Sequence, residues 1–297
     1  MKLQGMFAHA ATPFDHTGAI YRTKVQHNFG KWRRTSLAGF IVGSHAGEGP
    51  LLDAAEKVEI LKLAAPDDPA SGSSSILIAD VSREGVDVAV AEARAMADAG
   101  AAAVISRPPG EYRYIAGGSQ MESLYFRALA DRSPVPVVIH NLPAITGVDL
   151  EAATIAKLAE HPNIIGVLES GTPVERIREL RANCGKDFSI LAGSEGQVWE
   201  SLRAGANGAA LAFASAAPYA TIAIWEAFRT REEDAGVDWQ GRIAHPGELV
   251  TDVYGVPGLK HAMDLNGYYG GPARLPFSPL SAEGKKAVEE AFRDLKG

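Results

Sequence analysis

The sequence has only one cysteine in 297 residues and no long hydrophobic run, and both absences narrow the possible classes of protein. Cys184 has no second cysteine to pair with, which excludes an internal disulfide and suits a reducing compartment. No apolar stretch reaches the roughly 18 residues that suggest a membrane span, and the first residues lack the charged-then-apolar order of a signal peptide. We therefore expect a cytoplasmic protein with no membrane contact.

An excess of positive charge is absent as well. The chain has 36 acidic against 29 basic residues and a formal net charge of -7, which argues against a nucleic-acid partner. With 46% hydrophobic and 22% charged residues, the composition is ordinary for a globular protein. It excludes the disordered, collagen-like and disulfide-scaffold classes.

Short apolar runs bounded by turn residues alternate with segments of helical spacing. Runs that are apolar throughout are typical of strands buried on both faces. We predict strands at residues 5–11, 39–42, 76–79, 103–106, 135–140, 164–168, 188–192 and 208–213. About eight strands, most of them followed by a helix, favour a closed (β/α)8 TIM barrel, with a doubly wound open sheet as the alternative.

The chain continues well beyond the last predicted strand. Its remaining part has helical patterns around residues 218–233, 240–253, 257–266 and 282–295. Because no low-complexity linker precedes them, we expect one domain over residues 1–297, with the barrel at 1–215 and a C-terminal helical extension at 216–297. Within the barrel, Thr172, Pro173 and Glu175 have the pattern of a capping box, which predicts a helix that starts at Thr172.

The carboxyl ends of the strands are where barrels of this type build their ligand sites. At or just after the predicted strand ends stand Thr12, Ser44, His45, Asp80, Arg107, His140, Asn141, Glu169, Ser170, Ser194, Glu195 and Ser215. Histidine exchanges protons near neutral pH, and arginine can hold a carboxylate through two parallel hydrogen bonds. We therefore expect a small-molecule carboxylate ligand.

These positions lie within a series of motifs that cover nearly the whole chain. The motifs are at residues 11–15, 43–48, 140–143, 162–170, 192–194, 205–208 and 274–276. In their order and spacing the sequence resembles the dihydrodipicolinate synthase/N-acetylneuraminate lyase family. The resemblance implies a (β/α)8 barrel with a C-terminal helical region, assembled as a homo-oligomer (dimer or tetramer). It also implies chemistry on pyruvate or a related 2-oxo acid, bound as a Schiff base to a lysine.

The residues that would carry out the family's chemistry differ in this sequence. The Schiff-base lysine would stand at Leu168, which has no nitrogen to form an imine. His140 replaces the tyrosine that relays protons, and His45 and Ala46 replace the hydroxyl pair that helps to bind the substrate carboxylate. Lys260 and the other lysines lie away from the predicted strand ends. We therefore expect no pyruvate imine.

The candidate site residues form two groups. The catalytic candidates are His140, His45 and Glu169, and the substrate-binding candidates are Arg107, Ser44, Thr12, Ala46, Leu168 and Ala210. The histidines would move protons, the glutamate would orient them, and the arginine would anchor a carboxylate. Each polar candidate also has a structural alternative: a core imidazole or loop cap, an ion pair, or a hydroxyl that stabilises a turn.

Two functions of different classes are open. The first is a lyase-type enzyme that acts on a small oxo or hydroxy carboxylic acid by histidine-assisted proton transfer, without a lysine Schiff base. Its reaction would be an elimination, hydration or isomerisation. The second is an inactive binding or regulatory barrel that retains the pocket. The histidines lack a zinc-binding spacing, so we expect neither a metal nor another cofactor, and a metal-dependent aldolase is disfavoured.

Overall fold

Eight parallel strands close into one barrel in the computed structural model, which describes residues 1–65, 75–115 and 118–295. The strands are β1 (Gly5–His9), β2 (Gly39–Val42), β3 (Ile76–Asp80), β4 (Ala103–Ser106), β5 (Val137–Asn141), β6 (Ile164–Glu169), β7 (Ser189–Ala192) and β8 (Gly208–Leu211). They pair in sequence order, and β1 pairs with β8 to complete the circle. The predicted TIM barrel is confirmed, and the open-sheet alternative is wrong.

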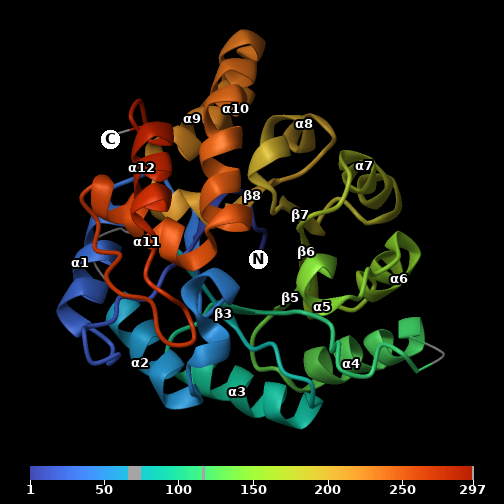
Figure 1. Ribbon diagram of the computed structural model, residues 1–297. Coiled ribbons are helices and arrows are strands. Elements are labelled where there is room, and N and C mark those ends of the chain that lie inside the picture. Colours follow the sequence, from blue (N-terminus) through green and yellow to red (C-terminus); the bar gives the residue numbers. More distant parts are fainter. Residues whose placement is uncertain (66–74, 116–117, 296–297) are drawn as a thin grey trace.

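Helices surround the barrel (Figure 1). They are α1 (Arg22–Trp32), α2 (Ala54–Ala64), α3 (Val86–Asp98), α4 (Gly118–Arg132), α5 (Pro143–Thr146), α6 (Ala152–Leu158), α7 (Val174–Asn183), α8 (Val198–Arg203) and α9 (Pro218–Thr230). Helix α9 packs against α8 and β1, so it covers the place where the last strand meets the first. The predicted barrel limit at residue 215 precedes this helix.

The chain ends in a C-terminal helical extension, as expected. It contains α10 (Glu233–Glu248), a π-helical turn (Leu249–Val253), α11 (Gly255–Leu265) and α12 (Ala282–Ala291), drawn in orange and red in Figure 1. Helix α10 contacts the turn after β7, while α11 contacts the turns after β2 and β8. The extension therefore packs on the carboxyl ends of the strands. In the part of the chain described, no helix is long and apolar enough to cross a membrane.

Two helix starts show how local sequence and tertiary contacts compete. The predicted capping box at Thr172 is wrong, because Thr172 Oγ1 donates to Glu169 Oε2 at 3.0 Å and α7 begins at Val174. A capping box occurs instead at the start of α2. There Asp53 accepts a hydrogen bond from the Glu56 N–H at 2.8 Å, and the Glu56 carboxylate accepts one from the Asp53 N–H at 3.1 Å.

Apolar side chains fill the inside of the barrel. This interior cluster includes Phe7, Ile41, Ile78, Ile105, Val138, Leu168, Leu191 and Ala210. Because side chains of a strand alternate between its two faces, the residues two positions further along begin the next inward layer. At this level Gly193 is required by space, since a Cβ there would lie 2.0 Å from Ser170 Oγ. The apolar interior of the barrel therefore ends at this layer, and polar side chains lie beyond it towards the carboxyl ends of the strands.

Candidate functional site

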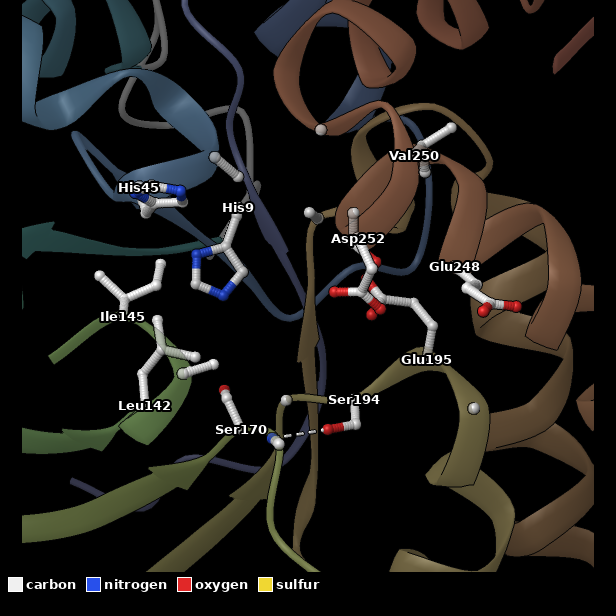
Figure 2. Close-up of a pocket in the computed structure, with 18 of the residues that line it drawn as sticks. His9, His45, Leu142, Ile145, Ser170, Ser194, Glu195, Glu248, Val250 and Asp252 are labelled. Carbon is white, nitrogen blue, oxygen red and sulfur yellow. Dashed lines mark hydrogen bonds between the residues drawn. The ribbon is translucent and has the colours of Figure 1, made fainter. Parts of the chain in front are cut away.

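A cavity of about 1090 Å³ opens at the carboxyl end of the barrel (Figure 2). Among its lining residues, those at strand ends are His9, His45, Ala46, His140, Ser170, Ser194, Glu195 and Ala210, and those of the C-terminal extension include His245, Glu248, Val250 and Asp252. No lysine or arginine is among the described residues of the lining. The cavity is therefore formed jointly by the barrel and its extension.

Two buried histidines form the floor of this cavity. His9 ends β1 and His140 lies near the end of β5, two positions after the interior residues Phe7 and Val138 respectively. Their ring centroids are 6.0 Å apart, and only 7% and 4% of their surfaces are exposed. His140 Nε2 lies 3.1 Å from Ser170 Oγ, while its Nδ1 is buried without a hydrogen-bond partner.

Burial keeps both floor histidines neutral near pH 7. It lowers the pKa of His140 to about 3, and His9 beside it acts in the same direction. Burial also lowers the pKa of His9 to about 4, although the buried Asp80 carboxylate opposes this change. Each ring can therefore offer one nitrogen as a donor and the other as an acceptor.

The predicted residues His45 and Arg107 lie at different depths. His45 is at the exposed rim, in the short turn His45–Gly47 after β2, and Figure 2 shows its ring facing the cavity beside His9. Desolvation by the surrounding wall and the nearby Arg107 charge lower the pKa of His45. Arg107 is not part of the lining, and its Nε donates to Ser82 Oγ at 3.3 Å.

Strand alternation separates Leu168 from its neighbour Glu169. Leu168 is fully buried in the barrel interior, beneath the cavity and paired in register with His140. Glu169 faces the other way, where its Oε2 accepts hydrogen bonds from Asn141 and Thr172, both at 3.0 Å. Burial raises the pKa of Glu169 to about 7, against the effect of these hydrogen bonds. The structure does not bring Glu169 to either histidine.

The two hydroxyl candidates are buried outside the lining. Thr12 Oγ1 donates to the Gly47 carbonyl at 2.7 Å, which ties the segment after β1 to the turn after β2. Ser44 is 1% exposed, and its Oγ has no hydrogen-bond partner. Of the remaining candidates, Ala46 and Ala210 line the cavity. The apolar candidates thus border the ligand space more directly than the hydroxyls do.

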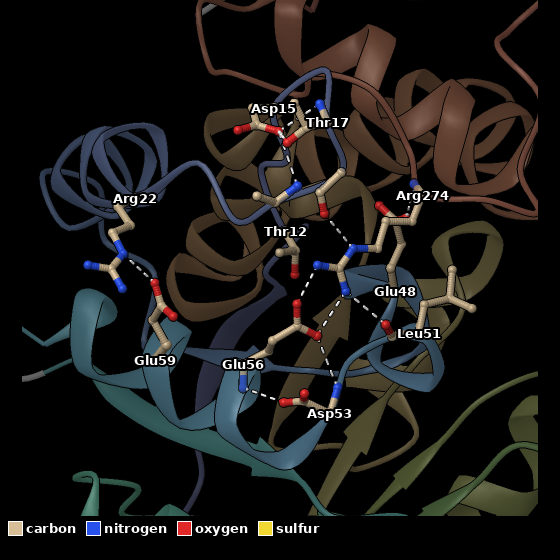
Figure 3. Close-up of polar contacts among 12 residues, drawn as sticks. Thr12, Asp15, Thr17, Arg22, Glu48, Leu51, Asp53, Glu56, Glu59 and Arg274 are labelled. Carbon is tan, nitrogen blue, oxygen red and sulfur yellow. Dashed lines mark hydrogen bonds and ion pairs between the residues drawn. The ribbon is translucent and has the colours of Figure 1, made fainter.

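Two charged residues of the predicted motifs, Glu48 and Arg274, form an ion-pair cluster with Lys260 and Glu56, and Figure 3 shows the contacts between Arg274 and Glu56. Lys260 Nζ lies 2.5 Å from Glu48 Oε1 and donates to the Pro272 carbonyl at 2.8 Å. Arg274 binds Glu56 with both terminal nitrogens, and its backbone N–H donates to Glu48 Oε2 at 2.7 Å. These contacts join the C-terminal extension to the barrel and leave Lys260 outside the lining.

Glu195, Glu248 and Asp252 form an acidic wall of the cavity, and Figure 2 shows Glu195 and Asp252 close together, opposite His9 and His45. Glu195 follows β7, whereas the other two come from the end of α10 and the π-helical turn. Glu195 is 8% exposed, and its Oε1 accepts a hydrogen bond from the Phe213 N–H at 3.3 Å. Burial raises the pKa of Glu195 to about 7, and repulsion by Asp252 adds to this effect.

Sequence reasoning missed His9 and the part of the wall that comes from the extension. For His9 the signal was present, because alternation from the buried Phe7 points residue 9 inward. For Glu248 and Asp252 no local signal exists, since only tertiary packing brings them to the cavity. In the described residues, no group of three or more His, Cys, Asp or Glu side chains is arranged to hold a metal ion.

A closed barrel with a polar cavity at the carboxyl ends of its strands defines a (β/α)8-barrel protein with its ligand site at the usual face of that fold. The chain belongs to the dihydrodipicolinate synthetase family, whose model matches residues 2–295. The resemblance found in the sequence motifs is confirmed at the level of the family.

Individual relatives are distant but match along most of their length. The 4-hydroxy-tetrahydrodipicolinate synthase of Stenotrophomonas maltophilia (strain R551-3) is 29% identical over 296 residues, covering 99% of this chain and 97% of the relative. The L-threo-3-deoxy-hexylosonate aldolase of Hypocrea jecorina is 26% identical, with coverage of 91% and 88%. The crystal structure of dihydrodipicolinate synthase DapA-2 from Bacillus anthracis superposes with a TM-score of 0.92 at 20% identity, covering 99% of each chain.

Proposed function

We propose that this protein is a lyase-type enzyme that acts on a small oxo or hydroxy carboxylic acid by histidine-assisted proton transfer, without a lysine Schiff base. The observation that carries the proposal is the pair His9 and His140 on the cavity floor, directly above Leu168. The names of the relatives support the substrate class, since both curated relatives act on small carboxylic acids by name.

The absence of an amine beside Leu168 supports the second half of the proposal. An imine needs a lysine nitrogen that can reach the bound carbonyl group. In the described part of the chain, no lysine lines the cavity, and the buried Lys260 is held by Glu48 and the Pro272 carbonyl. Buried Lys57 is likewise held, with its Nζ 2.8 Å from Glu92 Oε1.

A bound carboxylate would activate the floor histidines. Near pH 7 both rings are neutral, and a base with a pKa of about 3 takes a proton poorly. A negative charge placed beside His140 or His9 favours the imidazolium form and raises the pKa of the ring. The ligand thus supplies the charge that prepares a histidine to take a proton. His140 can then pass its proton through Ser170 Oγ, which lies 3.1 Å from Nε2.

Arg107 and Glu169 have positioning roles in this scheme. Arg107 is outside the lining; its charge and that of the buried Asp80 both act on His45 and His140, and Arg107 would supply the attraction for a carboxylate at that end of the cavity. Glu169 fixes Asn141, the last residue of β5, and Thr172, which lies in the turn after β6. Thr12 and Ser44 would shape the turn that presents His45 rather than contact the substrate.

The variant His140→Ala tests the proposal, with His16→Ala at an exposed position as the matched control. Turnover of whichever oxo or hydroxy acid the native protein converts should fall by about 10²–10⁴-fold, as expected for the loss of one positioned acid–base group. Thermal melting should change little, because the ring lines the cavity and its Nδ1 has no hydrogen bond to lose. Undiminished turnover in His140→Ala would contradict the role of this histidine.

An inactive binding or regulatory barrel is the second candidate. The observation that favours it is that the two floor histidines are both neutral in the free protein, so no strong acid stands there. A panel of oxo and hydroxy acids would show thermal stabilisation in either case, because a bound ligand stabilises the folded state. Binding without turnover across that panel would favour this candidate.

We also propose that the protein works in the cytoplasm as a homo-oligomer, a dimer or a tetramer. Exposed apolar side chains support an interface: Tyr112, Tyr114 and Ile115 lie in the segment after β4, and Leu124 lies on α4. The single cysteine, Cys184, is buried and unpaired, which suits a reducing compartment. Light scattering on the purified chain measures the assembly directly.

A further inference from the structure

The acidic wall combines one buried carboxylate, Glu195, with two solvent-exposed ones, Glu248 and Asp252. Among the described residues, neither Glu195 nor Asp252 has a lysine, arginine or histidine within ion-pair distance, and Glu195 has a hydrogen bond only to backbone N–H. Glu248 has a single ion-pair neighbour, the exposed His245, at 4.0 Å. A carboxylate that is nine-tenths buried is unfavourable without a counter-charge.

The backbone is arranged to hold the Glu195 side chain against the extension. Gly247, inside α10, leaves the space, since a Cβ there would lie 2.5 Å from Glu195 Cβ. Gln240 of the same helix donates to the Glu195 carbonyl at 2.8 Å. The π-helical turn that follows α10 then places Asp252 on the same wall, and π-helical turns are frequent at functional sites.

The two ends of the cavity differ in their charged groups. At the histidine end the cationic Arg107 and the buried Asp80 carboxylate both act on His45 and His140. At the other end the charges are those of Glu195, Glu248 and Asp252. A ligand with a carboxylate at one end and a positive charge at the other would match both ends, whereas a dicarboxylate would be repelled by the wall.

We propose that the ligand of this cavity is a zwitterion, an oxo or hydroxy carboxylic acid whose far end carries an ammonium group that binds between Glu195 and Asp252. Only the carboxylate end of this ligand rests on the proposed function. The ammonium would replace the missing counter-charge, and the carboxylate oxygens that face the cavity would accept its hydrogen bonds.

A set of three hydroxy acids of equal chain length tests the proposal: 6-amino-2-hydroxyhexanoate, 2-hydroxyhexanoate and 2-hydroxyhexanedioate. Calorimetric titrations at about pH 8 keep Glu195 ionised, because this is above its pKa. We expect the amino compound to bind at least about tenfold more tightly than 2-hydroxyhexanoate, and the dicarboxylate to bind more weakly than both. Equal affinities, or tightest binding of the dicarboxylate, would overturn the proposal.

Two variants locate the effect on the wall. Asp252→Asn and Glu195→Gln should each remove most of the preference for the amino compound. Asp238→Asn is the matched control, because it removes one negative charge from the exposed face of α10, where Asp238 pairs with Arg242 at 2.8 Å. It should keep the native preference. A preference that survives both wall variants would place the ammonium elsewhere and contradict the assignment.

A fourth probe separates this inference from the proposed function. The compound 6-aminohexan-1-ol has the ammonium group but no carboxylate. If it binds the native protein and not Asp252→Asn while all three hydroxy acids fail to bind, the ammonium site stands, but the hydroxy-acid function and the carboxylate end of the proposed zwitterion both fail. If the hydroxy acids bind with no dependence on their far end, the function stands and the ammonium site is wrong.

Discussion

The ion-pair cluster around Glu48 and the acidic wall around Glu195 lie at the same end of the barrel. They differ in whether their buried carboxylates are paired with cations. In the ion-pair cluster each carboxylate has a cation. Lys260 pairs with Glu48 at 2.5 Å. Arg274 binds Glu56 in a bidentate pair, as Figure 3 shows. On the acidic wall, Glu195 has no cation partner among the described residues.

This difference divides the residues of the motifs into those that hold parts of the fold together and those that line the cavity. Motif residues such as Thr12, Glu48 and Arg274 join turns to one another and the extension to the barrel, so their charges and hydroxyls are satisfied internally. His45 and His140, where the motifs predict a departure from the family pattern, line the cavity. Under the proposed function, the framework of the family would be kept while the chemistry of the cavity differs.

The largest effect should come from breaking the ion-pair cluster. In Lys260→Met, Glu48 is left buried without its cation, and a broken buried pair costs about 3–5 kcal/mol of folding free energy. Urea unfolding measures this loss. Glu59→Gln is the control, since it breaks the exposed pair of Glu59 with Arg22 and should cost at most about 1 kcal/mol. Equal losses in the two variants would show that the cluster is not the structural element described.

Substituting Glu195 on the acidic wall should have a smaller effect, and it should raise the folding stability rather than lower it. The pKa of Glu195 is raised from 4.5 to about 7, so the folded protein binds more protons there than the unfolded chain does. The contribution of Glu195 to folding stability is fully present below the pKa that this carboxyl group has in the unfolded chain. It is lost as the pH rises towards 7, and the loss amounts to up to about 3 kcal/mol. Glu195→Gln removes this loss, so the variant should be the more stable protein above pH 7.

Urea unfolding of both proteins between about pH 4.5 and 8 checks this expectation. The difference between Glu195→Gln and the native chain isolates the one carboxyl group, because the raised pKa of Glu169 and the lowered pKa values of His9 and His140 are common to both proteins. A difference that does not change with pH would mean that Glu195 titrates normally, and the contrast with the paired cluster would then disappear.

The strands were predictable from the sequence because their periodic signal is local. The runs at 39–42 and 103–106 match β2 and β4, and the others agree with their strands to within a few residues. Helix starts were less predictable. Thr172 has the sequence of an N-cap, but its hydroxyl binds Glu169 instead, because a buried carboxylate is a stronger hydrogen-bond acceptor.

The site was predictable only where a strand end sets the side chain's direction. His45, His140, Ala46 and Ala210 were expected near the cavity and line it. Glu169 was also expected there, yet the alternation that points Leu168 inward turns its neighbour outward. Residues from the extension could not be assigned, since their approach depends on how α10 and its π-helical turn pack on the barrel.

The most direct test of the whole account is reduction with borohydride in the presence of pyruvate, followed by mass measurement of the intact chain. A cavity without a reactive amine gives no trapped adduct, so the mass should stay unchanged. A stable mass increase that peptide mapping places on a lysine of the cavity would show that an imine forms, and it would contradict the account.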